Sequence, residues 1–198
     1  MSVRHLATIA AGLAALPLAG CISFGAEPPD ALLTLTAAAQ PQPGEAQTSA
    51  AARSIVVQVP ATPTAIAGGR VPVQSNGTSL AYVKDAQWSE PPARLFARLL
   101  ADTLTAQARM VVLTPAQSFS DPSANLAGEL RTFGLDAAQR QAVVTYDASL
   151  TRAGATAVEK RRFEARIPVA AIDAASAGTA LNQAANQVAG EVATWVAR

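Results

Sequence analysis

The side chains that most often carry out chemistry in proteins are rare in this chain of 198 residues. It has one cysteine, Cys21, and one histidine, His5. A Ser-His-Asp or Cys-His catalytic group needs a histidine beside the nucleophile, and zinc sites are built largely from histidine and cysteine. Acidic residues could still do acid–base chemistry, but no two of them stand out as a pair. The sequence therefore predicts that the protein is not an enzyme and has no metal site and no cofactor.

The N-terminal residues are laid out like an export signal. A basic start is followed by an apolar run from Leu6 to Leu18 and then by small residues before Cys21. The run is shorter than the ~20 residues that a membrane-spanning helix needs, which favours a signal peptide over residues 1–20. Leu18-Ala-Gly-Cys21 matches the lipobox of bacterial lipoproteins at every position. We therefore expect lipidation of Cys21, the alternative being an ordinary signal peptide with an incidental cysteine.

A lipidated Cys21 would anchor the mature chain, because two or three acyl chains hold a protein on a bilayer far more firmly than one. We expect such a chain in the cell envelope, facing the periplasm. Ile22 stands where inner-membrane lipoproteins of enteric bacteria tend to have aspartate. This favours the outer membrane over the inner membrane.

Composition narrows the remaining classes of function. Fifteen Lys and Arg against fourteen Asp and Glu leave a net charge of +1, whereas nucleic-acid-binding proteins normally carry a basic surplus. Half of the residues are hydrophobic, but 47 residues are alanine, and aromatic residues make up only 5%. We therefore expect no nucleic-acid partner and a core built mainly from small and aliphatic side chains.

The mature chain is expected to divide into a tether and one domain. Residues 21–53 should form a lipidated tether, with a short strand near 31–36 and an Ala/Pro/Gln linker over 37–52. A flexible linker of about 16 residues spans roughly 20–24 Å, so it would let the domain stand off the membrane. Residues 54–198 should form the folded domain.

Two helices are predicted within that domain. The first covers 91–108, with Ser89 as its cap and an apolar stripe that is either core or a partner-binding face. The stripe consists of Leu95, Phe96, Leu99, Leu100 and Leu104. The second helix covers 177–196. Its residues that face away from the apolar stripe are Asn182, Gln183, Asn186 and Glu191.

Strands are predicted around these helices. Their expected ranges are 54–60, 70–74, 78–84, 110–113, 125–133, 144–150 and 156–169. The last one carries a basic run, Lys160, Arg161 and Arg162, that could attract phospholipid headgroups or anionic partners. However, a period of two places Lys160, Arg162, Glu164 and Arg166 on one face, which favours a solvated face of mixed charge. The predicted fold class is α+β, a single domain with a mixed, mostly antiparallel sheet and two main helices packed on it.

Several soft motifs accompany the lipobox. The strongest runs from Leu80 through Trp88 to the proline that opens the leucine-rich helix, and Val57-Gln-Val-Pro60, Arg70-Val71 and Glu129-Leu-Arg-Thr-Phe133 add to it. In this order, from Ala31 to Trp195, the sequence resembles the ABC-type transport auxiliary lipoproteins, the PqiC-like periplasmic lipoproteins found beside Mce-type lipid transporters. The first strand lacks the family's usual tyrosine, and the linker is unusually long.

The resemblance implies a non-enzymatic accessory subunit of an ABC-type, Mce-associated phospholipid or lipid transport system. Its partners would be the membrane, an Mce-domain protein, and a separate ABC permease and ATPase. The alternatives are an envelope scaffold or assembly lipoprotein, and a soluble-domain lipid carrier. Trp88 and Arg70 suit a fold-forming role as well as a functional one, so no partner-binding residue is assigned. The transported substrate, its direction and association into a homo-oligomer stay open.

Overall fold

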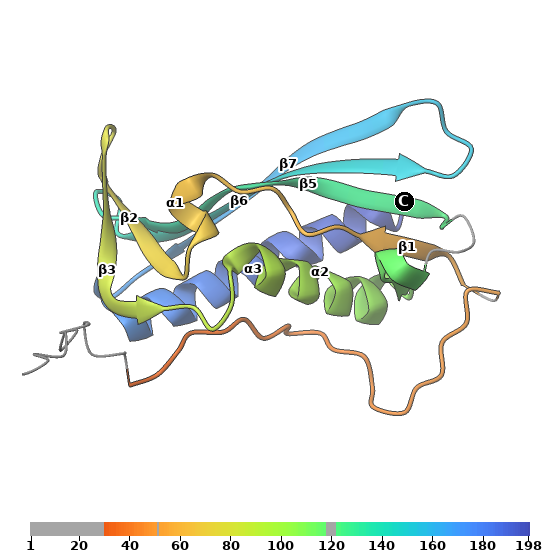
Figure 1. The fold of residues 1–198 in the computed structure, drawn as a ribbon, viewed down its shortest axis with the longest axis horizontal. Helices are drawn as coiled ribbons and strands as arrows, with labels where there is room; N and C mark the ends of the chain where they lie inside the picture. The colour runs from red at the N-terminus through yellow and green to blue at the C-terminus, as the bar shows by residue number, and fades with distance from the viewer. Residues whose placement is uncertain (1–29, 51, 118–121) are drawn as a thin grey trace, which may run out of the picture.

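A computed structural model describes residues 30–50, 52–117 and 122–198, so the predicted signal peptide and Cys21 lie outside the described residues. In chain order the elements are β1 (Ser54–Val57), α1 (Thr64–Ala67), β2 (Arg70–Asn76), β3 (Ser79–Gln87), α2 (Pro92–Ala108), β4 (Val111–Leu113), the 3-10 turn η1 (Pro115–Gln117), β5 (Ala124–Asp136), β6 (Gln141–Arg152), β7 (Val158–Pro168) and α3 (Ala174–Val196). Figure 1 shows their arrangement. Every predicted strand from residue 54 onward and both predicted helices are present.

The sheet is organised around β5. On one side, β6 pairs antiparallel along the whole of β5, and β7 pairs antiparallel with β6. On the other side, β1 runs parallel to the first part of β5, with Ile55 opposite Ala124, and β2 runs parallel to its last part, with Val73 opposite Leu135. β1 and β2 therefore lie one after the other along the same edge of β5. The short helix α1 lies in the connection between them. β3 and β4 extend this side, which completes a mixed sheet of seven strands.

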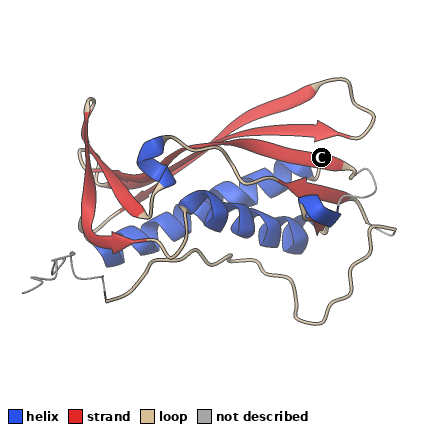
Figure 2. Cartoon of the chain, viewed as in Figure 1, coloured by secondary structure: helices blue, strands red, loops and turns tan. Residues whose placement is uncertain are grey.

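The two long helices cover one face of this sheet. α3 packs on β6 and β7, and α2 lies beside α3 (Figure 2). Along β6 the residues facing the helices are buried, among them Val144, Tyr146, Ala148 and Leu150. This two-layer arrangement confirms the predicted α+β fold, with the long pairings antiparallel and the parallel ones short.

The centre of the core depends on one close approach. The ring of Tyr146 packs edge-on against Phe96 of α2, with 5.3 Å between ring centroids, and its hydroxyl donates to the carbonyl of Ala127 at 3.0 Å. The ring lies against Gly128, where a Cβ atom would come within 2.7 Å of it. Glycine is therefore required at this position of β5, and burial raises the pKa of Tyr146.

The starts of both long helices differ from the sequence prediction. Ser89 does not cap α2: the cap position is Pro91, which makes no side-chain capping bond, and Pro92 occupies the first turn. α3 begins at Ala174, slightly before the predicted start, because the carboxylate of Asp173 accepts a hydrogen bond from the Ser176 N–H at 2.8 Å.

The segment before the domain is docked rather than paired as a strand. The predicted strand near 31–36 is reduced to a single bridge, Leu33 to Trp88. Residues 33–38, here called the strap, run along the helices in Figure 1 and bury Ala37. Asn182 accepts a hydrogen bond from the Thr36 N–H at 2.9 Å. Asn186 accepts one from the Ala38 N–H at 2.6 Å and donates one to the Thr36 carbonyl at 2.9 Å.

The strap changes the expected role of two asparagines and of the linker. Asn182 and Asn186 do lie on the side of α3 away from the sheet, but they bind the strap instead of facing solvent. Residues 39–50 form no helix or strand, as predicted for the linker. Since the strap is fixed to α3, this linker is a loop between two anchored points.

Because the apolar stripe of α2 is buried, a charged substitution within it should disrupt folding. Leu95 is 2% exposed, so Leu95→Glu would bury an unpaired carboxylate and should unfold the domain, whereas Leu95→Ala should cost about 2–5 kcal/mol. Urea unfolding followed by circular dichroism measures both. The neighbouring Arg94 is exposed, so Arg94→Glu serves as the control and should fold normally. A folded Leu95→Glu variant of ordinary stability would show that the stripe is not core.

The strap predicts a local effect of Asn186→Ala. Losing two hydrogen bonds should make strap opening easier by about 1–3 kcal/mol while global stability changes little. Thermolysin, which cleaves before large aliphatic residues such as Leu33 and Leu35, should then cut the strap faster. Gln183→Ala, an exposed position on the same helix, is the control. Equal cleavage rates for the two variants would contradict strap docking through Asn186.

Candidate functional site

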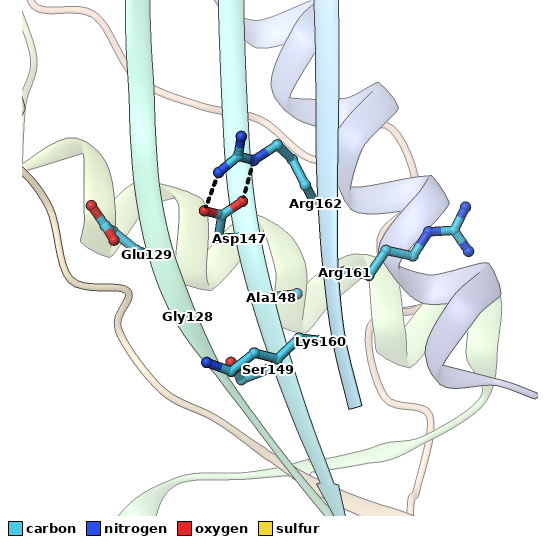
Figure 3. Close-up of a pocket in the computed structure, with 8 residues that line it drawn as sticks. All are labelled: Gly128, Glu129, Asp147, Ala148, Ser149, Lys160, Arg161 and Arg162. Carbon is cyan, nitrogen blue, oxygen red and sulfur yellow. Dashed lines mark hydrogen bonds and ion pairs between the residues drawn. The ribbon is translucent and has the colours of Figure 1, made fainter. Parts of the chain in front are cut away.

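The face of β5, β6 and β7 that the helices leave uncovered carries most of the polar side chains that these strands present. We call it the open sheet face. Its polar residues include Glu129, Arg131, Asp136, Thr145, Asp147, Ser149, Lys160, Arg162, Glu164 and Arg166. A shallow hollow of about 500 Å³ lies over its middle, and Figure 3 shows the residues that line it. The alternation predicted for 160–166 is confirmed, because Lys160, Arg162, Glu164 and Arg166 are exposed while Phe163 and Ala165 are buried.

Asp147 is the electrostatic centre of this face. Arg162, directly opposite on β7, donates from Nε and Nη2 to its two carboxylate oxygens at 2.6 and 2.7 Å (Figure 3). Nη1 of Arg131 lies 3.6 Å from an oxygen of the same carboxylate. The same nitrogen lies 3.7 Å from a carboxylate oxygen of Glu129. The hydrogen bonds from Arg162, helped by the charge of Arg131, lower the pKa of Asp147. The carboxylate is therefore held ionised between two guanidinium groups.

A second group of charges lies further along the same strands. Arg166 donates to Glu164 at 2.8 Å, and the hydroxyl of the buried Thr145 donates to the other oxygen of Glu164 at 2.9 Å. These two hydrogen bonds lower the pKa of Glu164. Arg166 also lies 3.9 Å from Asp136. Acids and bases alternate across the face, so it presents a balanced pattern and no excess of one sign.

The basic run at 160–162 does not form one patch. Lys160 and Arg162 lie on the open sheet face, and Arg162 is neutralised by Asp147. Arg161 projects on the opposite side of β7, with its guanidinium carbon 5.0 Å from the ring centroid of Phe163. Among the described residues, Lys160 has no ion-pair partner. On the open sheet face, the basic run that could attract headgroups therefore contributes a single unpaired lysine.

Arg131 is a residue that sequence reasoning did not place. The pairing of β5 with β6 shifts by one between Leu130 and Thr132, so Arg131 is the extra residue of a bulge. Strict alternation continued from the buried Leu126 and Leu130 would have placed Thr132 on the helix side and Phe133 on the open side. The bulge turns both Arg131 and Thr132 outward and returns Phe133 to the core. Nothing in the residue types alone signals this shift.

The other residues singled out in the sequence belong to the fold. Trp88 is 2% exposed and packs against Phe133 at 5.3 Å between ring centroids, and its indole N–H finds no partner among the described residues. The guanidinium of Arg70 stacks on the ring of Tyr82 at 3.8 Å from the centroid. Trp88 is thus a core residue and cannot contact a partner directly.

The described ranges contain no group of three or more His, Cys, Asp and Glu residues arranged to hold a metal ion. None of the helices seen in those ranges is both long and apolar enough to cross a membrane. A second hollow, of about 590 Å³, lies between the loop after the strap and the end of α2. Polar and small side chains line most of it, with Met110 and Val111 as its larger aliphatic groups.

Because the pKa of Asp147 is lowered, its contribution to the free energy of unfolding should depend on pH. A carboxylate with a depressed folded-state pKa stabilises the protein above its unfolded-state pKa and loses that effect as pH falls through the folded-state value. Asp147→Asn should therefore cost up to about 1 kcal/mol near neutral pH, the range of solvent-accessible ion pairs, and nothing well below pH 4. Urea unfolding at several pH values measures this. Glu191→Gln, whose carboxylate accepts from Gln187 on α3, is the control. A pH-independent cost would contradict the ionised Asp147.

Comparisons with known proteins identify the fold and the family. The fold is shared with the crystal structure of protein XCC0632 from Xanthomonas campestris, of the family DUF330, with a TM-score of 0.69 and 21% identity over 84% of this chain and 95% of that one. A second solved structure, of an uncharacterized protein, has a TM-score of 0.63 and 17% identity over 73% of this chain and 92% of that one. No curated protein matches the chain. A family model for the ABC-type transport auxiliary lipoprotein component matches residues 33–193. Because that match spans most of the chain, the protein belongs to this family and is an accessory component of ABC-type transport in the cell envelope.

Proposed function

We propose that the protein is a non-enzymatic lipoprotein subunit of an Mce-associated ABC system that moves phospholipids or related lipids. The observation that carries this proposal is family membership over 33–193, which takes in the strap and most of α3. The lipobox that ends at Cys21, upstream of this region, would supply the anchor. The protein would face the periplasm, held in the outer membrane in preference to the inner one.

In this proposal the domain acts by binding other proteins. Its open sheet face carries exposed charges of both signs in balance, which suits a protein surface of complementary pattern better than an anionic headgroup layer. An Mce-domain protein of the same system, with its separate permease and ATPase, is the proposed partner. A second copy of the chain is an additional candidate for contact.

The lipid-carrier alternative has less support. A carrier needs a cavity lined by large apolar side chains. The hollow on the open sheet face and the one beside the end of α2 both open at the surface and are lined mainly by polar and small side chains. The interior between sheet and helices is filled by side chains that are buried to within a few per cent. The envelope-scaffold alternative differs from the transport proposal only in its partners, so partner capture discriminates between them.

Crosslinking in intact membranes followed by affinity capture and mass spectrometry tests the proposal. The wild-type chain should recover an Mce-domain protein with its permease and ATPase, and Cys21→Ser should lose most of that recovery because the domain is no longer held at the membrane. Lys160→Glu with Arg162→Glu should weaken capture more than Arg94→Glu, an exposed change on α2. Recovery of peptidoglycan or outer-membrane assembly factors alone would instead favour the scaffold.

A further inference from the structure

The strap fixes the point from which the tether leaves the domain. The Leu33 N–H donates to the Gln87 carbonyl at 2.7 Å, and the Ser89 N–H donates to the Leu33 carbonyl at 2.8 Å. The Leu33 side chain fills the space over Gly178, where a Cβ would lie 2.8 Å from it. Gly178 lies in the second turn of α3. The chain therefore enters the folded domain at the N-terminal end of α3.

Several turns meet at this end of the molecule, which we call the anchor end. The β5–β6 turn lies here, because Asp136 pairs with Gln141 at the close of the ladder. Gln141 also pairs with Pro168, so the segment that leads into α3 lies at the same end. Gln74 of β2 pairs with Asp136, which brings the β2–β3 hairpin to this end as well. In Figure 1 these segments lie along the left end of the molecule, with the hairpin above and the start of α3 and the beginning of the strap below.

The stretch between Cys21 and the strap is on average short compared with the domain. Twelve residue steps separate Cys21 from Leu33, the first residue of the strap, and they span at most about 40–43 Å when fully extended and roughly 17–21 Å root-mean-square by square-root scaling. α3 alone is about 34 Å long at 1.5 Å for each of its 23 residues. The linker at 39–50 follows the strap, so it adds nothing to this reach. A lipid anchor at Cys21 would therefore keep the anchor end nearer the bilayer than the far end.

Exposed apolar side chains gather at the same end. Among the described residues, five large hydrophobic side chains are strongly exposed, and three of them lie here: Leu32 at 52%, Leu80 at 46% and Ile172 at 45%. Leu80 pairs with Gln74 in the hairpin, and Ile172 immediately precedes α3. Charged residues of both signs lie on the same elements: Arg70, Lys84 and Asp85 in β2 and β3, and Asp173 at the start of α3.

We infer that the anchor end faces the membrane and that Leu32, Leu80 and Ile172 contact its phospholipid surface. This inference rests on the proposed lipidation of Cys21. Burial of the three side chains at the acyl boundary removes apolar surface from water, and the mixed charges nearby require no excess of anionic lipid. The far end, with the β6–β7 turn, points away from the bilayer towards a partner in the periplasm.

Fluorescence quenching in vesicles tests this orientation. Single-cysteine variants Leu80→Cys, Ile172→Cys and the far-end control Val158→Cys are made in the full-length lipidated protein and labelled with an environment-sensitive fluorophore. Val158 is a fair control because it is 54% exposed and opens β7 at the far end. The proteins are reconstituted in phosphatidylethanolamine–phosphatidylglycerol vesicles that contain nitroxide-labelled lipid. Labels at Leu80 and Ile172 should be quenched several-fold more than the label at Val158.

Two measurements distinguish a failure of the proposed lipidation from a failure of the proposed orientation. Mass spectrometry of the peptide that contains Cys21 reports acylation, and an unacylated Cys21 would overturn both the anchor and this inference. Equal quenching at all three positions in an acylated protein would overturn the inference alone. In a background of Asn182→Ala with Asn186→Ala, which releases the strap, quenching at Val158 should rise towards that at Leu80. An unchanged difference would show that the strap does not orient the domain.

Discussion

The register between β5 and β6 is the constraint on which the other features depend. It places Tyr146 over Gly128 on the helix side and Asp147 between Arg131 and Arg162 on the open side. A slip of one residue would exchange the two faces, so an aspartate would enter the core and a tyrosine would enter water. The ring of Tyr146 fits only over a glycine, and the bulge at Arg131 restores the alternation for the core residue Phe133. The pairing of β5 with β6 thus determines both which side chains enter the core and which charged groups meet on the open sheet face.

Because the helices cover one face of the sheet, their own outer side is free to bind another part of the chain. The strap occupies part of that side. It is held by the Thr36 and Ala38 N–H groups, which donate to Asn182 and Asn186, by the Asn186 amide, which donates to the Thr36 carbonyl, and by the packing of Leu33 on Gly178. The family match begins at residue 33, where the strap begins. Residues 33–38 are therefore part of the fold, and a lipid at Cys21, as proposed, would be linked to the domain at the end where they dock.

The parts that sequence reasoning predicted are those governed by local periodicity. Burial of one face explains both the alternation along β6, at Val144, Tyr146, Ala148 and Leu150, and the leucine spacing of α2. These two patterns therefore predicted the strand and the helix correctly. The strap has no such signal, because its asparagine partners lie about 150 residues away and its own alanines resemble a linker. The tandem placement of β1 and β2 beside β5 and the bulge at Arg131 also depend on long-range pairing, which residue types do not encode locally. Lipidation of Cys21 was argued from a motif and lies outside the described residues.

In this proposal the anchor at Cys21 is coupled to the domain through the docked strap. Amide hydrogen exchange of the full-length lipidated protein in vesicles tests this most directly, because it compares two adjacent segments of one chain. The account predicts that the amides of Thr36 and Ala38, which donate to Asn182 and Asn186, are protected well above those of the loop at 41–50. If the amides of Thr36 and Ala38 exchange as fast as those of the loop, docking of the strap is contradicted. The domain would then be joined to the anchor by an undocked segment and would have no preferred face towards the membrane.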